Sequence, residues 1–235
     1  MPLCDVHCHI LPGMDDGAKD EDVSLAMLEE DYWQGVTHIA ATPHYYPKET
    51  VDQFLIRRVE AAQRLVEALC ESQWEEHPAV VLGAEVAYHN GLIYEEKLQR
   101  LCIGDSNYLL LEMPFAKWEP GVLRDVRMLR HSRGFMPIIA HLERFFAYED
   151  KRTIQELLDM DVKIQMNAEY ILNPKTSKKA RKLLQSGVVD LLGSDSHNME
   201  SRCPNLRDAY DQLDSWGMED VSDQLAENAM DIFGL

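Results

Sequence analysis

Two histidines separated by a single residue, His7 and His9, stand near the start of the chain, and the paired carboxylates Asp15 and Asp16 follow them. Side chains two positions apart on a β-strand point to the same face, so both imidazoles would be directed the same way. Two such nitrogens can bind one cation, and imidazole mixed with carboxylate suits Mn²⁺, Fe²⁺ or Zn²⁺. This spacing therefore predicts part of a metal site.

Further histidines and carboxylates stand at the ends of later apolar segments. They are His44 in ATPHYY, Glu85 in GAEV, Glu112 in LLLEMP, His141 in IIAHLER, and Asp195 and His197 in GSDSHN. Burying Glu85 or Glu112 without a partner would be costly, which favours a bound cation. With His7, His9 and Asp16, the set contains nine predicted ligands, too many for one ion and suitable for two or three. The other histidines lack this context and are expected not to bind metal: His38, His77, His89 and His131.

Seven short apolar segments alternate with longer amphipathic ones, and no linker rich in Ser, Gly or Pro interrupts them. We expect strands over residues 3–10, 37–42, 79–86, 108–113, 136–141, 162–167 and 188–193. Strands that alternate with helices predict βαβ units and a parallel sheet buried on both faces. We therefore expect one α/β domain over residues 1–235.

Such a sheet can remain open or close into a barrel. No Gly-rich phosphate loop follows the first strand, and polar residues follow almost every strand, which together favour the barrel. In a parallel barrel the carboxyl ends of all strands lie on one rim, so the nine ligands would meet there. Cys4 and Cys8 alternate with the two histidines and are predicted to pack toward the helices.

One amphipathic helix is predicted over residues 51–69, opened by Thr50 and Gln53 at capping-box spacing. Gly35 and Gly187 are expected where other helices end. The apolar face of the helix over residues 51–69 is expected to contain Phe54, Leu55, Val59, Ala62, Leu65, Val66 and Leu69.

The composition narrows the function classes. A net charge of −18 without a basic cluster argues against nucleic-acid binding. No apolar run approaches the roughly 20 residues that a membrane-spanning helix needs, and no signal peptide is recognisable, so no stable membrane insertion is expected. Five cysteines without a CxxC pair suit a reducing compartment, and we expect a cytoplasmic protein.

Seven motifs occur in order over essentially the full chain: HCH, DDG, TPH, GAE, LEM, AHLER and SDSHN. Together they resemble the polymerase and histidinol phosphatase (PHP) superfamily. The short chain without inserts, the stretch HILPGMDDG and the arginine after SDSHN make it most similar to the bacterial CpsB/CapC-type manganese-dependent protein-tyrosine phosphatases of capsule and exopolysaccharide synthesis.

This resemblance implies a distorted (β/α)7 TIM-like barrel with a site for two or three divalent ions. Mn²⁺ is the expected ion, and Fe, Zn or Mg are the alternatives. The implied ligands are His7, His9, Glu85 and Asp195 for the first ion, Glu85, Glu112 and His141 for the second, and Asp16, His44 and His197 for the third. Arg144 and Arg202 would bind the substrate phosphate. The resemblance assigns no role to Asn167 and Glu169.

The activity implied is phosphomonoester hydrolysis, with the phosphotyrosine tail of a membrane tyrosine autokinase as substrate. A metal-activated hydroxide would attack phosphorus while both arginines hold its oxygens. Asp16 and His197 are the candidates for proton transfer to the leaving group. A small-molecule phosphatase, for example one acting on histidinol phosphate, remains an alternative on the same scaffold, as does a non-catalytic metal-binding module.

The loops around the rim would distinguish these alternatives, because the tail of a protein substrate needs an open entrance to the site. The aromatic residues expected to surround it are Tyr45, Tyr46, Phe115, Trp118, Phe145, Phe146 and Tyr148. Cysteine-dependent phosphatase chemistry is excluded, because none of the five cysteines is followed six positions later by arginine. No GxxxxGK motif supports a P-loop kinase.

Overall fold

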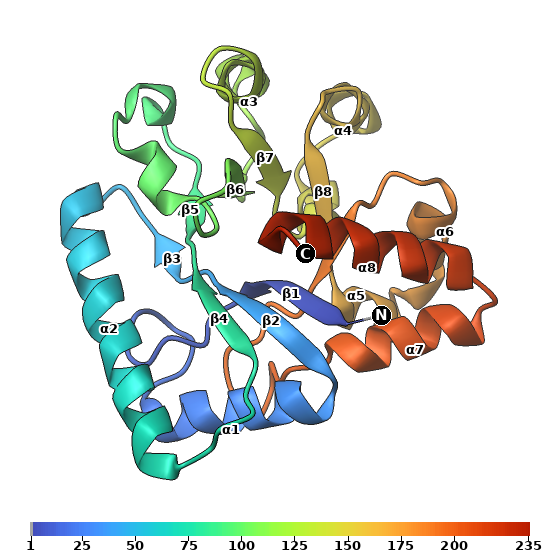
Figure 1. The fold of residues 1–235 in the computed structure, drawn as a ribbon. Coiled ribbons are helices and arrows are strands. Elements are labelled where there is room, and N and C mark those ends of the chain that lie inside the picture. Colours follow the sequence, from blue (N-terminus) through green and yellow to red (C-terminus); the bar gives the residue numbers. More distant parts are fainter. Residues whose placement is uncertain (1) are drawn as a thin grey trace.

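The computed structural model describes residues 2–235, and its elements alternate between strands and helices (Figure 1). The strands are β1 (Leu3–Cys8), β2 (Val36–Ala41), β3 (His44–Tyr45), β4 (Ala79–Leu82), β5 (Glu85–Ala87), β6 (Tyr108–Glu112), β7 (Met136–Ile139), β8 (Lys163–Asn167) and β9 (Leu191–Gly193). The helices are α1 (Glu21–Trp33), α2 (Val51–Ser72), α3 (Pro120–His131), α4 (Lys151–Leu158), α5 (Ala168–Leu172), α6 (Ser177–Gln185), α7 (Leu206–Ser215) and α8 (Glu219–Phe233). Short 3₁₀ helices cover Leu92–Tyr94, Leu98–Leu101 and Leu142–Ala147.

All strand pairs among these residues are parallel, in one sheet ordered β1-β2-β4 and another ordered β3-β5-β6-β7-β8-β9. Each predicted strand segment is present, one of them is divided, and β3 lies outside the predicted segments. The chain continues from β2 into β3 after Thr42 and Pro43, and the predicted strand 79–86 is divided into β4 and β5. Pro43 has no N–H to donate to a ladder, which accounts for the break after β2.

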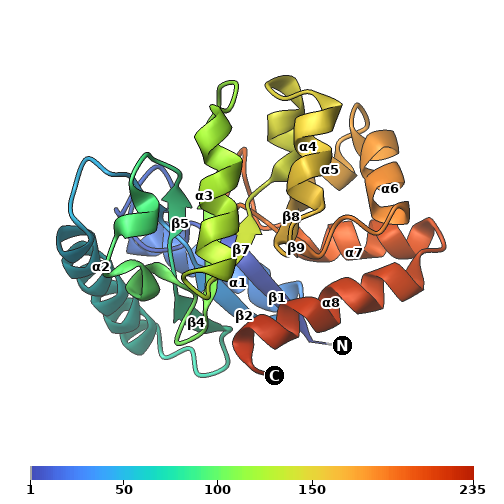
Figure 2. The same cartoon turned by 90° about the horizontal axis from the view of Figure 1, so that it is seen from above.

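The two ends of the strand array meet between β1 and the segment after β9. Cys8 and Ser196 form a parallel bridge, His9 N donates to Ser196 O at 2.9 Å, and Asp195 N donates to His7 O at 2.8 Å. The helices lie around the strands (Figure 1, Figure 2). The predicted parallel α/β fold with a curled, barrel-like sheet is confirmed.

A β-bulge in β1 directs the histidines inward. Asp5 pairs with Ile39 and Cys8 pairs with Ala41, so β1 contains one more residue than β2 over this stretch. Cys4 packs in the smaller buried cluster, together with Val6 of β1 and with Ala229 and Ile232 of α8 (Glu219–Phe233). Cys8, beyond the bulge, packs in the larger cluster between strands and helices, as predicted.

Helix α2 begins with the predicted capping box, since Thr50 and Gln53 each accept from the other's backbone N–H. Val59 and Val66 were expected on its apolar face but are exposed by 46% and 58%. The 3.6-residue period of the helix turns both away from the face that buries Phe54. Gly35 and Gly187 follow the ends of α1 and α6 with φ of 76° and 72°, the left-handed conformation that favours glycine.

Within residues 2–235, no helix combines the length and apolar character that crossing a bilayer requires.

Candidate metal centre

All nine predicted ligands lie where the carboxyl ends of the strands meet. Their positions are His7 and His9 at the end of β1, His44 in β3, Glu85 in β5, Glu112 in β6, His141 after β7, Asp195 and His197 after β9, and Asp16 in the loop before α1. The rim of a parallel barrel thus gathers side chains from both ends of the sequence. Their binding of metal stays a prediction that the geometry below supports.

The first group surrounds Glu85 and Asp195. The Nε2 atoms of His7 and His9 lie 3.1 Å apart, and each lies 3.3 Å from Glu85 Oε2. Asp195 Oδ1 lies 3.4 Å from the first nitrogen and 3.5 Å from the second. Two nitrogens and two carboxylate oxygens therefore converge, as the ligand set for one ion requires.

The second group shares Glu85 with the first. His141 Nε2 lies 2.8 Å from Glu85 Oε1 and 3.5 Å from Glu112 Oε1. His44 also joins this group, because its Nδ1 lies 2.9 Å from Glu85 Oε2. Glu85 therefore sits between two sets of donors and can bridge two ions.

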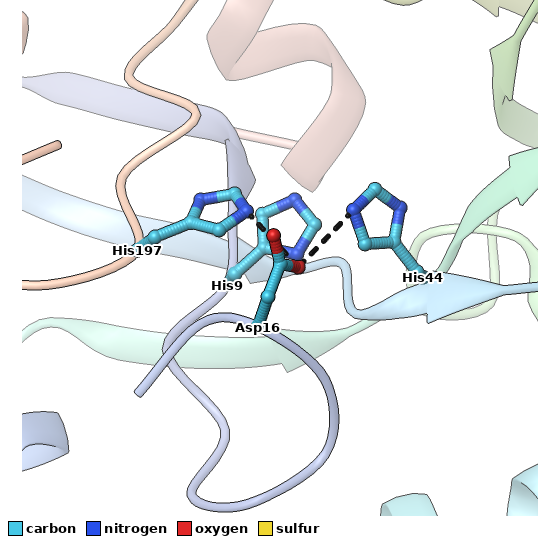
Figure 3. Close-up of side chains that lie close together, drawn as sticks. All are labelled: His9, Asp16, His44 and His197. Atoms are coloured by element: carbon cyan, nitrogen blue, oxygen red, sulfur yellow. Dashed lines mark ion pairs between the residues drawn. The ribbon is translucent and has the colours of Figure 1, made fainter. Parts of the chain in front are cut away.

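The third group brings His44 and His197 to Asp16, whose Oδ1 lies 3.5 Å from the Nε2 of each (Figure 3). His9 is also close enough to share an ion with these three. The expected division into separate sets is thus less sharp than the resemblance implies, because His9 and His44 each face two groups.

Unpaired buried atoms test whether cations fit this site. Glu85 Oε2, His44 Nδ1 and His197 Nε2 are inaccessible to solvent and make no hydrogen bond of acceptable geometry. Buried polar atoms are almost always satisfied, so three unsatisfied atoms in one place indicate missing partners. Imidazole nitrogens and carboxylate oxygens are the donors that Mn²⁺, Fe²⁺ and Zn²⁺ accept, so the residues fit divalent ions.

Hydrogen bonds orient three of the imidazoles, and two of these bonds come from residues outside the predicted set. The Nδ1 atoms of His7, His9 and His197 contact Gln165 Oε1 at 3.2 Å, Asp15 Oδ2 at 2.8 Å and the Asp195 carbonyl at 2.9 Å. Donation from Nδ1 leaves each Nε2 lone pair free for a metal. We therefore assign Asp15 and Gln165 a positioning role that the sequence reading missed.

Asn167, which the sequence left without a role, also holds a predicted ligand in place. Its Nδ2 donates to Asp195 Oδ2 at 2.7 Å. Gln165 and Asn167 alternate along β8 and share one face, and this spacing was the available signal for both. Glu169 instead lines a cavity of about 310 Å³ beside Arg144 and Arg202.

Two predicted ligands have an unusual backbone conformation. His141 has φ of 34° and Asp195 has φ of 53°, and within residues 2–235 only one other non-glycine residue, Gln73, has positive φ. Such conformations cost free energy and persist where the surrounding structure holds them. Both side chains are therefore placed by a backbone that regular strands do not adopt.

Both predicted phosphate-binding arginines contact the same carboxylate. Arg144 Nη2 lies 2.5 Å from Asp195 Oδ2, and Arg202 Nη2 lies 2.6 Å from Asp195 Oδ1. About a third of each arginine side chain is exposed. A guanidinium has five donors, so each arginine can keep this contact and still donate to an anion above the centre.

In this centre, the charge of each buried carboxylate or imidazole shifts the pKa values of its neighbours. Burial opposes protonation of His141, but Glu112 and Glu85 outweigh it and raise its pKa to about 9. Burial also opposes ionisation of Glu85, yet His7 and the neighbouring imidazoles lower its pKa well below the usual range. For His197, burial and the charges of His9 and Arg202 lower the pKa to about 4. Without metal, protons on some imidazoles thus balance the buried carboxylates.

The expected aromatic rim is only partly exposed. Three of its residues are buried because they pack into the larger core cluster: Tyr45, Trp118 and Phe145. The exposed ones are Tyr46, Phe115, Phe146 and Tyr148. The histidines predicted not to bind metal, His38, His77, His89 and His131, lie outside all three groups.

Gly17→Ala should reduce metal content and thermal stability. A Cβ at Gly17 would lie 2.3 Å from the His9 carbonyl oxygen and 2.5 Å from His9 Cβ, so the loop carrying Asp15 and Asp16 would have to move. Elemental analysis after dialysis against Mn²⁺ and thermal melting would measure both effects. Gly121→Ala in α3 is the control, because only the flexible Arg124 approaches it, at 3.4 Å. Wild-type metal content in Gly17→Ala would contradict this role.

Metal binding should release protons at pH 7. With its pKa raised to about 9, His141 is protonated there in the metal-free protein and must lose that proton to bind a cation. Affinity should therefore rise between pH 7 and pH 9, by about tenfold per pH unit for each proton released. Calorimetry of Mn²⁺ binding in buffers of different ionisation enthalpy would count the protons, with His77→Gln as control. Zero release, or affinity that falls as pH rises, would refute this coupling.

The fold and the centre can be compared with known proteins. Residues 3–234 match the family described as capsular polysaccharide synthesis, CpsB/CapC. The tyrosine-protein phosphatase CpsB of Streptococcus pneumoniae is 31% identical over 229 residues, covering 89% of this chain and 88% of its own. The tyrosine-protein phosphatase YwqE of Bacillus subtilis is 28% identical over 235 residues, covering 97% and 90%.

Solved structures agree with this match. One from a study of YwqE from Bacillus subtilis and CpsB from Streptococcus pneumoniae, described as unique metal-dependent tyrosine phosphatases, superposes with a TM-score of 0.83 at 26% identity, covering 97% of this chain and 93% of that one. An inactive dihydroorotase-like domain from Chaetomium thermophilum, at 12% identity and a TM-score of 0.59, shares the fold alone. The match over nearly the whole chain and the relatives' identity establish that this chain belongs to the CpsB/CapC family of capsular polysaccharide synthesis.

Proposed function

We propose that this chain, acting as one domain over residues 1–235, is a metal-dependent phosphomonoesterase that hydrolyses phosphotyrosine in proteins. The observation that carries the proposal is the contact of two arginines with Asp195, itself a predicted metal ligand. That arrangement supports the proposal, because phosphoryl transfer needs donors for the phosphate oxygens beside bound cations. The relatives named tyrosine-protein phosphatase support phosphotyrosine as the substrate.

The nine predicted ligands would hold two or three divalent ions, with Mn²⁺ as the proposed metal and Fe, Zn or Mg as substitutes. Glu85 would bridge ions, because its two oxygens face different donor groups. When bound, such ions lower the pKa of water and neutralise charge on a phosphoryl group.

The protein's own groups would orient the ester. Arg144 and Arg202 would donate to its non-bridging oxygens and fix phosphorus over the centre. Asp195 holds both guanidiniums in position, since each of its oxygens accepts from one arginine. A phenolate leaving group has a conjugate-acid pKa of about 10, so it needs less protonation than an alkoxide.

Asp16 and His197 remain the candidates for proton transfer. Asp16 is the more exposed, with 66% of its side chain accessible at the mouth of the site. His197 is buried and its pKa is lowered to about 4, first by burial and then by His9, so it is neutral near pH 7. That state suits a metal ligand better than a proton donor.

The proposed physiological substrate is the phosphorylated tail of a membrane tyrosine autokinase in capsule or exopolysaccharide synthesis. The family description supports that process. Five free cysteines among the described residues suit the cytoplasm, where the catalytic tail of such a kinase would lie.

The Mn²⁺-loaded protein should release phosphate from a phosphotyrosine peptide, and a chelator should abolish that release. Asp195→Asn should lose activity together with metal, because the amide keeps the side-chain shape but removes the negative charge. Phosphate release and metal content would be measured on the same samples. Faster turnover of histidinol phosphate than of the peptide would refute the tyrosine assignment and leave the metal centre intact.

Arg144→Ala should lower kcat/KM for the peptide by about 10- to 100-fold, the loss expected for a charge-assisted phosphate contact of about 1.5–3 kcal/mol. Most of the change should appear in KM while metal content is retained. The matched control is Arg152→Ala, which removes an exposed arginine in α4. An Arg144→Ala protein with wild-type kcat/KM would show that this arginine does not bind phosphate.

A further inference from the structure

A second hollow lies between α1 and the end of α2, away from the metal centre. We call it the aromatic hollow; its volume is about 270 Å³, and it is lined by Leu25, Glu29, Tyr32, Trp33, Ser72 and Trp74. Trp33 is the last residue of α1, which leads into β2, and Trp74 precedes β4. These connections enter the strands at their amino ends, whereas the predicted metal ligands lie at the carboxyl ends. The aromatic hollow is therefore separate from the proposed phosphatase site.

Three aromatic rings of the hollow stand at steep angles to one another. The Tyr32 centroid lies 5.4 Å from that of Trp33, at an interplanar angle of 73°, and 5.6 Å from that of Trp74, at 88°. Trp33 is 73% exposed, so most of its indole is uncovered. Proteins bind organic cations in hollows lined by several aromatic rings, because the negative face of each ring attracts positive charge.

The charged groups at the hollow also favour a cation. The carboxylate of Glu29 lines it, and the Tyr32 hydroxyl donates to Glu76 Oε2 at 3.3 Å, which brings a second carboxylate close. The last turn of α2 contains no basic residue that would offset the negative end of that helix. Arg207 Nε donates to the Gln34 carbonyl beyond α1 at 3.0 Å but does not line the hollow. The lining therefore contains negative charge and no positive charge.

Other aromatic rings of this protein already pair with cations from the same chain. Arg181 Cζ lies 5.6 Å from the centroid of Trp216, and Lys48 Nζ lies 5.4 Å from that of Tyr46. Within residues 2–235, no lysine or arginine lies in this way over any of the three rings of the aromatic hollow. The pair of Arg181 and Trp216 shows the kind of contact that the exposed indole of Trp33 could make with a guanidinium from another molecule.

We propose that the aromatic hollow is a docking site for a basic segment of a partner protein and receives one arginine side chain of that segment. A guanidinium is planar and weakly hydrated, so it can stack on the indole of Trp33 while its charge is balanced by Glu29. Charge complementarity selects this occupant, because a neutral apolar segment would gain nothing from the two carboxylates. The site is independent of the proposed phosphatase activity, since it uses none of the predicted metal ligands or phosphate-binding arginines.

Two short peptides test the docking site on the full chain. One has a central arginine between serine and glycine residues, and the other has citrulline, a neutral group of the same shape, in its place. NMR titration in Mg²⁺, which does not broaden the signals, should show the arginine peptide shifting the indole N–H signals of Trp33 and Trp74. The citrulline peptide should bind at least about fivefold more weakly, because it lacks the charge. No turnover is measured, so an inactive protein would leave this comparison valid.

Variants of Trp33 test the contribution of its ring. Trp33→Leu should weaken the arginine peptide by about two- to fivefold, followed on the Trp74 signal, while Trp33→Phe should retain most of the affinity. The side chain is largely exposed, so the thermal melting temperature should stay at the wild-type value. Tyr94→Leu is the control, because it removes an aromatic residue that is 76% exposed and does not line the hollow.

A glutamate variant tests the contribution of charge. Glu29→Gln should weaken the arginine peptide and leave the citrulline peptide unchanged, because only the first gains from the carboxylate. Glu60→Gln is the matched control, since it removes the same charge from an exposed position in α2 outside the hollow. An equal loss in Glu60→Gln would overturn the docking site by assigning the effect to the net charge of the protein.

Three other results would overturn the proposal. The first is equal affinity of the arginine and citrulline peptides for the wild type, and the second is unchanged arginine affinity in Trp33→Leu. The third is binding of choline as tight as that of the arginine peptide, which would assign the hollow to a small organic cation. A Trp33 signal that shifts with protein concentration in the absence of peptide would also contradict it, by placing a second copy of this chain in the hollow.

Discussion

The structure depends on one carboxylate that is removed from water and surrounded by imidazole nitrogens. Glu85 is 1% exposed, and nitrogens from four histidines approach its two oxygens within 3.3 Å. A buried carboxylate stays ionised only when positive charge compensates it, and here either protons or metal ions can do so. The strands that carry those histidines must therefore close around β5. Metal binding at this centre would therefore be linked to the protonation of the histidines and to folding of the barrel.

Much of this arrangement could be predicted from the sequence, because two simple regularities produce it. Alternation of apolar and amphipathic segments indicates parallel strands, and parallel strands bring their carboxyl ends to one rim. The position of Glu112 or His141 at the end of its segment was therefore enough to predict that it lies on the same rim as His7. Neither inference needs any knowledge of side-chain packing.

The rest depends on interactions that periodicity does not encode. The bulge in β1 arises from pairing with β2, so it could not be predicted from alternation along one strand. Phe145 was expected on the surface because it lies in a loop, but neighbouring elements cover it. Asp15 and Asp16 are the same residue type, and only the direction of the side chain distinguishes their roles. The Asp15 carboxylate is held by donors from His9 and His44.

The bridge between Cys8 and Ser196 also has a consequence for how the protein is made. His7 and His9 are synthesised before Asp195, so β1 and the segment after β9 can meet only when all the intervening residues have been made. Contacts between such distant residues form late, since closing the long intervening loop costs conformational entropy. A nascent chain thus displays histidines without the carboxylate that completes their site. The predicted metal site would therefore be complete only after the barrel has closed.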